Sequence, residues 1–448
     1  MKKKFAFIGA GSLDFTRDLI RDLLTFKSFE DCEIWLMDID EKRLKYAKDG
    51  VTRIVEYGKY PATIHATLNR REALENADGV LITILQGGVE VWRHDIEIPA
   101  KYGVDICVGD TRGPSGIFRF LRTAPEMLSI IRDCEEICPN AIILNYTNPM
   151  AMLVSYLQSQ TKLNVTGLCH SVQGTAQMIA GWLDRDIKDI NYTCCGINHQ
   201  AFYLKYEDKE GNDLYPQLRE VVKKDEVYME EQVRVEMFKH LGFFPTESSG
   251  HNSEYNPWFR KRKDLIEKYC TKGTGWNPGA HAYILDEYLE RENSWEKEYL
   301  EWVNSGEIDL ARGEEYASNI FNAIFGDGTP YEFNGNLRNK GYITNIKEGA
   351  CVEVPVIATK EGIKVKGSNT LPAHLEALVG NSANLEELAV LAAIEGDPNK
   401  VFYAILMDPL TASVCSMEEI RSMVQEMLDK NANYLKYFKS LKIDITNK

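Results

Sequence analysis

The sequence predicts a doubly wound α/β domain with a parallel sheet, followed by an α+β domain. Through the first third of the chain, short apolar runs alternate with helical patterns. Most of these runs are uninterrupted by polar residues, which is typical of parallel strands buried on both faces. After about residue 190 the segments become longer, more charged and helix-rich, and strands no longer alternate with helices. We therefore expect residues 1–195 to form the first domain and residues 196–448 the second, with a shared cleft.

Apolar runs mark the expected strands in chain order. The first run, 5–8, precedes a helical pattern over 14–26 whose apolar residues are spaced to face a core. Further strand candidates in the first domain are 33–37, 63–67, 79–85, 105–108, 141–145 and 165–168. In the second domain the strand candidates are 201–206 and 350–357, and the helix-rich segments are 221–241 and 385–439.

Composition and charge restrict the class of protein. With 44% hydrophobic residues the chain can bury a large core, and its net charge of −15 does not suit a nucleic-acid-binding protein. The apolar stretch after Lys4 is too short for an export signal, and we find no run of eighteen apolar residues. The ten cysteines lack the spacing of a disulfide framework. We therefore expect a cytoplasmic protein with reduced thiols and no membrane partner.

A glycine-containing motif lies where the first strand meets the first helix. Gly9-Ala10-Gly11-Ser12 lets backbone N–H groups approach a pyrophosphate at the positive end of a helix. Asp38, at the tip of the second strand, can accept hydrogen bonds from ribose hydroxyls and would repel a 2′-phosphate. Asp14 replaces the third glycine of the fingerprint, and two glycines alone also suit a simple turn. Together, the flanking strand, helix and acid favour dinucleotide binding, with NAD preferred to NADP.

Two later loops support this interpretation. Leu85-Gln86-Gly87-Gly88 and Asn145-Tyr146-Thr147-Asn148-Pro149 both follow expected strands, and such sheets bind ligands at the carboxyl ends of their strands. Gly-Gly and Asn-Pro pairs are also ordinary turn sequences. We take Gln86 and Asn145 as candidate cofactor contacts.

A cysteine and a histidine form a candidate metal pair. Cys169-His170 ends one strand, and Asn198-His199 ends another apolar stretch. A thiolate and an imidazole can hold a divalent transition metal while leaving coordination positions open for a substrate. An isolated cysteine or histidine is more often a core or surface residue, so the spacing alone does not establish a metal site.

Five motifs follow one another along the chain: Gly9-Ala10-Gly11-Ser12, the segment 109–116, Asn145-Tyr146-Thr147-Asn148-Pro149, the segment 169–175 and Gly196-Ile197-Asn198-His199. They occur in the order found in glycoside hydrolase family four, and the chain resembles in particular the α-galactosidase (melibiase) branch of that family. The likeness covers nearly the whole sequence and continues through 247–249 and 254–259 to 407–409.

The resemblance implies a Rossmann-type nucleotide domain, similar to that of lactate and malate dehydrogenases, in an enzyme that hydrolyses glycosides. Family members use NAD and usually Mn²⁺, or another divalent transition metal, in place of the usual carboxylate pair. The implied reaction is oxidation at sugar C3, removal of the C2 proton, elimination of the C1 leaving group, water addition and reduction of the ketone. The expected activity is that of an α-galactosidase cleaving α-galactosides such as melibiose.

The resemblance also assigns roles to individual residues. Cys169 and His199 match the metal ligands, and Asn148 matches a residue that contacts the sugar hydroxyls near the metal. Tyr255 matches the base. Its phenol has an ordinary pKa of about 10 and would need a nearby cation, and a packed aromatic beside Trp258 is the alternative role.

The general acid is less clearly assigned. The residue after the metal cysteine protonates the leaving group in some members and is acidic or an amide there, whereas this chain has His170. A histidine can donate a proton at physiological pH. Asp110 and His251 are polar residues on motif loops and remain alternatives.

Several other functions share these features. A 2-hydroxy-acid dehydrogenase shares the nucleotide motifs but does not need Cys169, and a nucleotide-sensing binding protein would leave the metal pair without a role. Within the family, α-galacturonidase, α-glucosidase and α-glucuronidase activities are alternatives, whereas the motif after Cys169 differs from that of branches acting on 6-phosphorylated sugars. A uronide needs a cationic partner, and residues 260–263 supply four cations that are more typical of a solvated charge run.

Family likeness suggests a homodimer or homotetramer.

Overall fold

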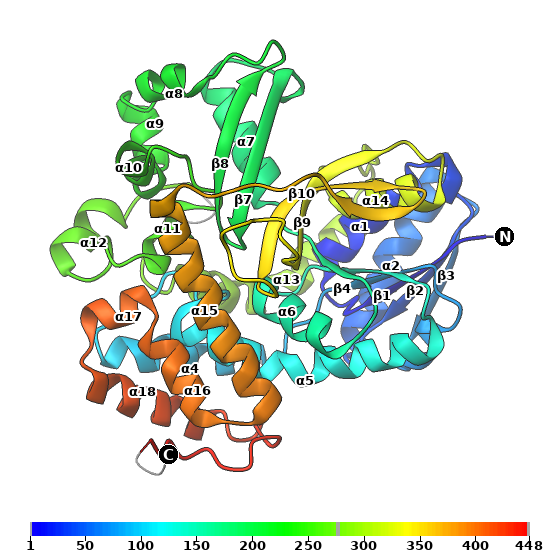
Figure 1. The fold of residues 1–448 in the computed structure, drawn as a ribbon. Coiled ribbons are helices and arrows are strands. Elements are labelled where there is room, and N and C mark those ends of the chain that lie inside the picture. Colours follow the sequence, from blue (N-terminus) through cyan, green and yellow to red (C-terminus); the bar gives the residue numbers. More distant parts are fainter. Residues whose placement is uncertain (1, 275–277, 446–448) are drawn as a thin grey trace.

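The computed structural model describes residues 2–274 and 278–445 (Figure 1). Within these residues, one mixed sheet of eleven strands crosses the whole molecule in the order β3-β2-β1-β4-β5-β6-β9-β10-β7-β8, with β11 paired to β10. Its first six strands are parallel and the others are antiparallel. The expected doubly wound α/β architecture is confirmed.

The parallel strands follow the predicted apolar runs. In the first strand all five residues are buried, and Phe5 and Phe7 join the core on one face of the sheet while Ala6 and Ile8 join the core on the other. A strand covered on both faces therefore needs apolar residues throughout. The parallel strands are β1 (Lys4–Ile8), β2 (Glu33–Met37), β3 (Thr63–Thr67), β4 (Gly79–Ile82), β5 (Ile142–Asn145) and β6 (Val165–Gly167).

One predicted strand is wrong. Residues 105–108 form an irregular segment between α4 and α5. The backbone N–H groups of Cys107, Val108 and Gly109 donate to the buried carboxylate of Glu254, at 2.9, 3.0 and 3.0 Å. A side chain therefore satisfies the N–H groups that a neighbouring strand would otherwise bind.

The second half of the chain extends the same sheet across residue 195. Its antiparallel strands include the two predicted strands of this region and three that were not predicted. These strands are β7 (Ile190–Ile197), β8 (Gln200–Asp208), β9 (Tyr331–Arg338), β10 (Cys351–Thr359) and β11 (Gly362–Val365).

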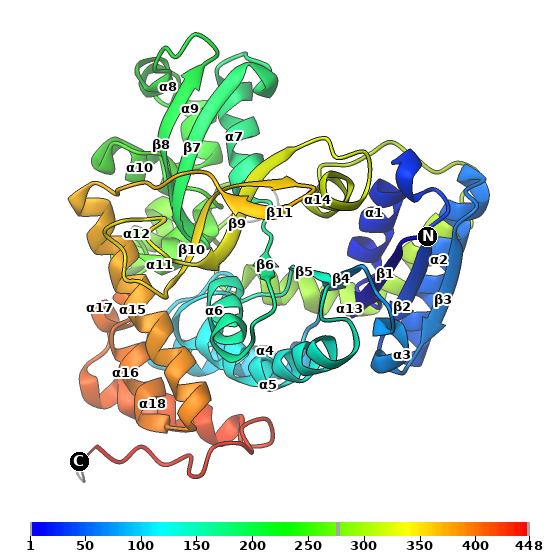
Figure 2. The same ribbon diagram turned by 45° about the vertical axis from the view of Figure 1, so that its right-hand side comes forward.

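Helices cover both faces of the parallel part, as Figure 2 shows. One face carries α1 (Leu13–Leu24), α2 (Glu41–Gly58) and α14 (Tyr316–Phe325). The other face carries α3 (Arg70–Leu74), α4 (Gly88–Lys101), α5 (Gly113–Ile137) and α6 (Met150–Gln160). This second layer is covered in turn by α15 (Ala373–Glu395), α16 (Pro398–Leu406) and α18 (Met417–Lys430).

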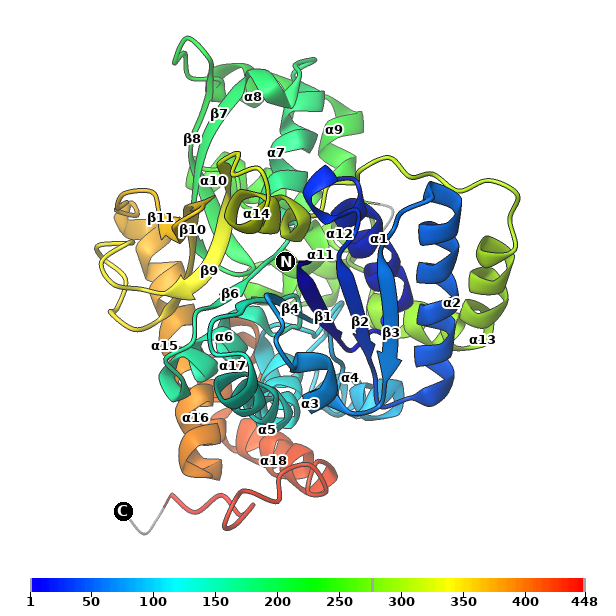
Figure 3. The same ribbon diagram turned by 90° about the vertical axis from the view of Figure 1, so that its right-hand side faces the viewer.

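A third core lies around β7 and β8, where α7 (Ser171–Trp182), α8 (Tyr215–Val221), α9 (Asp225–Glu230) and α10 (Gln232–Leu241) pack. The remaining helices are α11 (Ser249–Tyr255), α12 (Lys263–Tyr269), α13 (Tyr283–Val303) and α17 (Pro409–Val414), with short 3₁₀ turns at Lys27–Phe29 and Ile187–Asp189. Although α13 belongs to the second half, it lies along α2 (Figure 3).

Among the described residues, one helix, α15, is long and apolar enough to cross a membrane by length and composition. Half of its most apolar stretch is buried inside the molecule, where the helix packs against α16, α6 and α5. This packing is that of a core helix in a folded domain.

Candidate active site

The glycine motif forms a tight turn between β1 and α1. A Cβ atom on Gly9, which has a φ of +90°, would overlap the carbonyl oxygen of Thr83, and one on Gly11 would lie 2.7 Å from Asp38 Oδ2. The N–H of Gly11 donates to the same Asp38 oxygen at 2.7 Å, and that of Ser12 donates to the carbonyl of Gly9 at 3.0 Å. The structure thus brings the four predicted residues together at the N-terminus of α1, in an arrangement that fits a pyrophosphate and a ribose.

The other two candidate cofactor contacts differ in accessibility. Gln86 is half-buried in the loop between β4 and α4. Asn145, the last residue of β5, is fully buried. Its Nδ2 donates to the carbonyl of Thr147, and its Oδ1 accepts from the N–H of Thr147, both at 3.0 Å. The side chain of Asn145 therefore shapes the loop that carries Asn148.

Three side chains from distant segments form a cluster that can hold a metal ion. Cys169 follows β6, His199 follows β7, and Glu247 precedes α11. Their ligand atoms lie within 4.8 Å of one another, with Glu247 Oε2 at 3.9 Å from Cys169 Sγ and 3.7 Å from His199 Nε2. A sulfur, a nitrogen and a carboxylate oxygen are a donor set that suits a divalent transition metal.

His199 also belongs to a second group, with Asp110 and His251, whose ligand atoms again lie within 4.8 Å of one another. His251 Nε2 is 3.6 Å from Asp110 Oδ1, and its Nδ1 is 3.6 Å from Glu247 Oε1. The rings of His199 and His251 are nearly perpendicular, with centroids 5.2 Å apart. Both groups thus surround one polar centre.

A hydrogen-bond chain sets the tautomer of His199. The hydroxyl of Thr111 donates to Asp110 Oδ1 at 2.7 Å and lies 3.1 Å from His199 Nδ1. Since the hydroxyl has a single proton, it accepts from Nδ1–H of the ring. His199 Nε2 therefore presents its lone pair to the cluster, as a metal ligand requires.

Burial and neighbouring charged groups shift the pKa values of the acidic side chains in the cluster. Burial alone would raise the pKa of Glu247, but His199 and His251 more than offset this and lower it. The pKa of Asp110 is also lowered, against the effect of burial, because its carboxylate faces His251 and His199. Burial, with the nearby charges of Glu247 and Glu353, raises the pKa of the Cys169 thiol well above its ordinary value.

Glu247 has a strained backbone. Its φ of +67° lies in the left-handed region, which a residue with a side chain seldom occupies. The strain costs on the order of 1–3 kcal/mol and concentrates at functional sites. Here it directs the carboxylate toward Cys169 and His199.

Several buried polar atoms near the cluster have no hydrogen-bond partner in the part of the chain that the structure describes. Among the described residues these include Asn148 Oδ1, Asn198 Oδ1 and the phenol oxygen of Tyr255. Asn148 Nδ2 donates to Asp110 Oδ2 at 3.2 Å, which places the amide at the edge of the cluster. Because unpaired buried polar atoms are rare, the site fits a bound metal and a polyhydroxylated ligand.

Tyr255 is 2% exposed and ends α11, with its ring 5.9 Å from that of His251. The guanidinium of Arg112 lies over the ring at 5.0 Å and is held by Glu386 of α15 at 2.8 Å. Burial raises the pKa of the phenol well above 10, as do the charges of Asp110 and two glutamates, while Arg112 opposes this. The predicted base thus lies beside the cluster, buried against a cation.

His170 lies apart from the cluster. Its Nε2 contacts Glu315 Oε1 at 2.5 Å, and its ring packs near Phe15 and Tyr146. Burial lowers the pKa of the imidazole, but the hydrogen bond and the charge of Glu315 outweigh this and raise it. His170 therefore retains its proton to higher pH than an ordinary histidine.

Sequence reasoning did not assign Glu247 or Glu353 to the site. Glu247 stands in one of the quoted motifs, and this was its only signal. Glu353, on β10, accepts from Asn198 Nδ2 at 3.5 Å and from Asn336 Nδ2 at 3.2 Å. Burial, partly offset by His199, raises the pKa of Glu353 to about 7. Its apolar strand sequence gives no indication of the position.

The fold and the site together define a family 4 glycosyl hydrolase. The Family 4 glycosyl hydrolase model matches residues 4–185, and the model of the Family 4 glycosyl hydrolase C-terminal domain matches residues 194–411. These matches span most of the chain, and the protein belongs to this family.

Particular relatives extend the likeness over nearly the full length. The chain is 37% identical to an α-galactosidase from Rhizobium meliloti (strain 1021), over 96% of this chain and 89% of the relative. It is 35% identical to an α-galactosidase from Bacillus subtilis (strain 168), over 98% and 100%. A 6-phospho-α-glucosidase from gut microorganisms, solved in complex with NAD and Mn²⁺, shares the fold with a TM-score of 0.81, at 21% identity over 99% and 100% of the two chains.

Proposed function

We propose that this protein is an α-galactosidase that requires NAD and Mn²⁺ or a similar divalent metal. The observation that carries the proposal is that one chain holds both the Cys169–His199–Glu247 cluster and a dinucleotide-type glycine loop. A hydrolase that used a carboxylate pair alone would need neither feature. The two α-galactosidases that are similar over nearly the whole chain support the choice of sugar.

The residues present fit both groups. Cys169, His199 and Glu247 would hold the metal, and the loop 9–12 with Asp38 would hold the dinucleotide. When bound, NAD supplies a hydride acceptor and the metal supplies a Lewis acid for the C2 and C3 oxygens of the sugar.

Tyr255 removes the proton from sugar C2 in this proposal. Its phenol oxygen has no hydrogen-bond partner among the described residues, and burial together with the surrounding carboxylates raises the pKa of the phenol. Arg112 lies over the ring, and positive charge at the neighbouring cluster acts in the same direction, favouring the phenolate. Asn148, oriented by Asp110, presents Oδ1, which has no hydrogen-bond partner among the residues that the structure describes, to a sugar hydroxyl.

His170 donates the proton to the leaving group. The pairing of His170 with Glu315 keeps the imidazole protonated to higher pH. Because its side chain is 46% exposed, the imidazole is accessible to the departing alcohol. Asp110 is less suited to this role because its lowered pKa keeps it ionised. It serves as the acceptor that orients Asn148 and Thr111.

The cations that follow the Tyr255 motif support a neutral sugar. Arg260 is not part of a solvated run as expected: it is 1% exposed and donates to the carbonyls of Asp105 and Gly279 at 3.0 and 2.6 Å. Residues 261–263 are exposed. The buried guanidinium is thus engaged in the protein, which leaves no reason to assign it to a C6 carboxylate.

A panel of p-nitrophenyl glycosides tests the proposal. With NAD, Mn²⁺ and a reductant present, the α-galactoside should be cleaved, and melibiose with it. Omitting NAD or chelating the metal should abolish turnover. Preference for the α-galacturonide would replace the galactosidase assignment, and turnover that survives both removals would overturn the mechanism.

We also place the enzyme in the cytoplasm, as a homodimer or homotetramer. Nine of the ten cysteines are buried, and no disulfide joins any two of them in the part of the chain that the structure describes, which suits a reducing compartment. Light scattering of the purified protein distinguishes these assemblies from a monomer.

A further inference from the structure

Helix α13 contacts both α1 and α4, the helices that follow the two loops flanking the expected dinucleotide site. Its residue Tyr288 packs edge-on against Trp92 of α4, with ring centroids 5.1 Å apart. One turn later, Arg291 Nη2 contacts Asp14 Oδ2 of α1 at 2.6 Å. Since α1 follows β1 and α4 follows β4, this turn crosses the point where the strand order reverses. Nucleotides bind there in such sheets.

Asp14 creates an electrostatic problem at this position. It lies in the first turn of α1 and replaces the last glycine of the fingerprint. A carboxylate at this end of the helix repels a pyrophosphate, whose binding relies on the positive helix end. Two guanidinium groups counter it: Arg17 Nη1 is 3.2 Å from Asp14 Oδ1, and Arg291 approaches the other oxygen.

The backbone of α13 is fixed independently of Arg291. Tyr299 packs against Gly50 of α2, where any side chain would overlap the phenol oxygen. The guanidinium of Arg43, in α2, stacks on Trp295 at 4.4 Å, and Lys42 pairs with Glu296 at 2.8 Å. Arg291 itself is 55% exposed, and Asp14 is its only ion-pair partner among the described residues. Its head group can therefore turn while the helix stays in place.

We propose that Arg291 is a cofactor-binding residue that contacts the pyrophosphate of the bound dinucleotide. The second half of the chain thereby supplies a cation to a site built by the first half. Planar guanidinium groups bind phosphate oxygens with two parallel hydrogen bonds, and such charge-assisted bonds are strong. The inference rests on the proposed use of NAD and adds a ligand outside the glycine loop.

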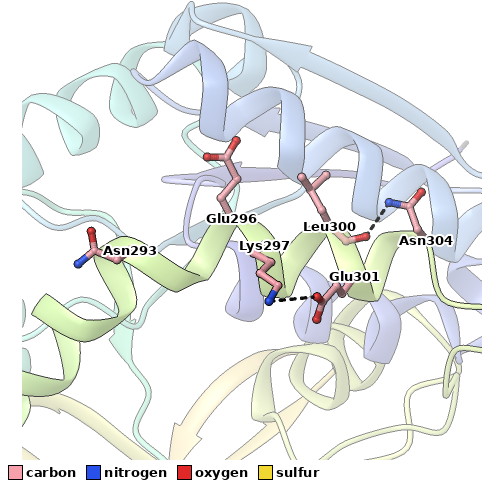
Figure 4. A pocket seen from close by; sticks show the side chains of 6 residues that line it. All are labelled: Asn293, Glu296, Lys297, Leu300, Glu301 and Asn304. Carbon is pink, nitrogen blue, oxygen red and sulfur yellow. Dashed lines mark hydrogen bonds and ion pairs between the residues drawn. The ribbon is translucent and has the colours of Figure 1, made fainter.

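Calorimetric titration of the full chain with NAD and with adenosine tests the inference. Arg291→Met should weaken NAD binding by about tenfold or more, the loss expected for one charge-assisted hydrogen bond. It should leave adenosine binding unchanged, because adenosine lacks the pyrophosphate. The matched control is Lys297→Met, since Lys297 lies on the same helix, is 81% exposed and, within the described ranges, has Glu301 as its single ion-pair partner along the groove of α13 (Figure 4).

Three outcomes would overturn the inference. They are unchanged NAD affinity in Arg291→Met, an equal loss of NAD and adenosine binding, or an Asp14→Asn/Arg291→Met double variant that binds NAD as well as Asp14→Asn alone. The last result would mean that Arg291 only neutralises Asp14. Failure of the unaltered protein to bind NAD would instead refute the proposed function, so the two failures are distinguishable.

Discussion

Thr111→Val should weaken metal binding without changing any ligand. Thr111 is 1% exposed, and its hydroxyl links His199 Nδ1 to Asp110 Oδ1. Valine has nearly the same shape, so packing is retained. The substitution leaves the buried Nδ1–H of His199 without an acceptor and frees the ring to adopt the other tautomer, which turns a proton toward the cluster.

The size of the effect follows from this geometry. Leaving one buried donor unpaired costs about 1–3 kcal/mol. Loss of a group that orients a metal-bound histidine lowers metal affinity about 10–100-fold, or roughly 1.4–2.8 kcal/mol. The two estimates agree because both describe the same hydrogen bond.

Calorimetric titration with Mn²⁺ measures this loss directly. Thr111→Ser keeps the hydroxyl and is the matched control, so its affinity should stay close to that of the unaltered protein. If Thr111→Val binds Mn²⁺ as tightly as the serine variant, the hydroxyl does not orient His199, and the tautomer argument is wrong.

Three further predictions follow from the site. Tyr255→Phe keeps the buried ring but removes the phenolate, so kcat should fall at least about 100-fold with unchanged stability; a near-normal kcat assigns the base elsewhere, with His251 next. Because the pKa of Cys169 is raised, the metal-free site holds a thiol, and binding as thiolate releases its proton; Mn²⁺ affinity should rise about tenfold per pH unit near neutrality, and Cys169→Ser should remove this slope. Arg260→Met leaves Asp105 without its buried partner and should cost about 3 kcal/mol in urea denaturation, whereas a loss below about 1 kcal/mol would show the ion pair to be dispensable.

The first half of the fold was predictable because its strands are buried on both faces. β1 and β5 coincide with short apolar runs in the sequence. The segment 105–108 has the same texture, yet its N–H groups bind Glu254 from a helix about 145 residues later. The carboxylate that binds these N–H groups is distant in the sequence, so only the folded structure reveals it.

The site was predictable only in part, for a similar reason. Cys169 and His199 end apolar strands and stand out locally. Glu247 joins them from a separate loop, and the spacing of these residues in the sequence does not predict that contact. Arg260 looks solvated beside three other cations, but the fold buries it against Asp105. Local patterns report on local structure, whereas the ligands of this site come from distant segments.

The most direct test of the central claim is turnover in D₂O. If Tyr255 removes the proton from sugar C2 before the glycosidic bond breaks, the return of a solvent-derived proton should place deuterium at C2 of the released galactose. Nuclear magnetic resonance or mass spectrometry of the product measures this incorporation, with substrate recovered after incubation with Tyr255→Phe as the control. Galactose released with hydrogen alone at C2 would indicate direct displacement at C1 and would contradict the mechanism.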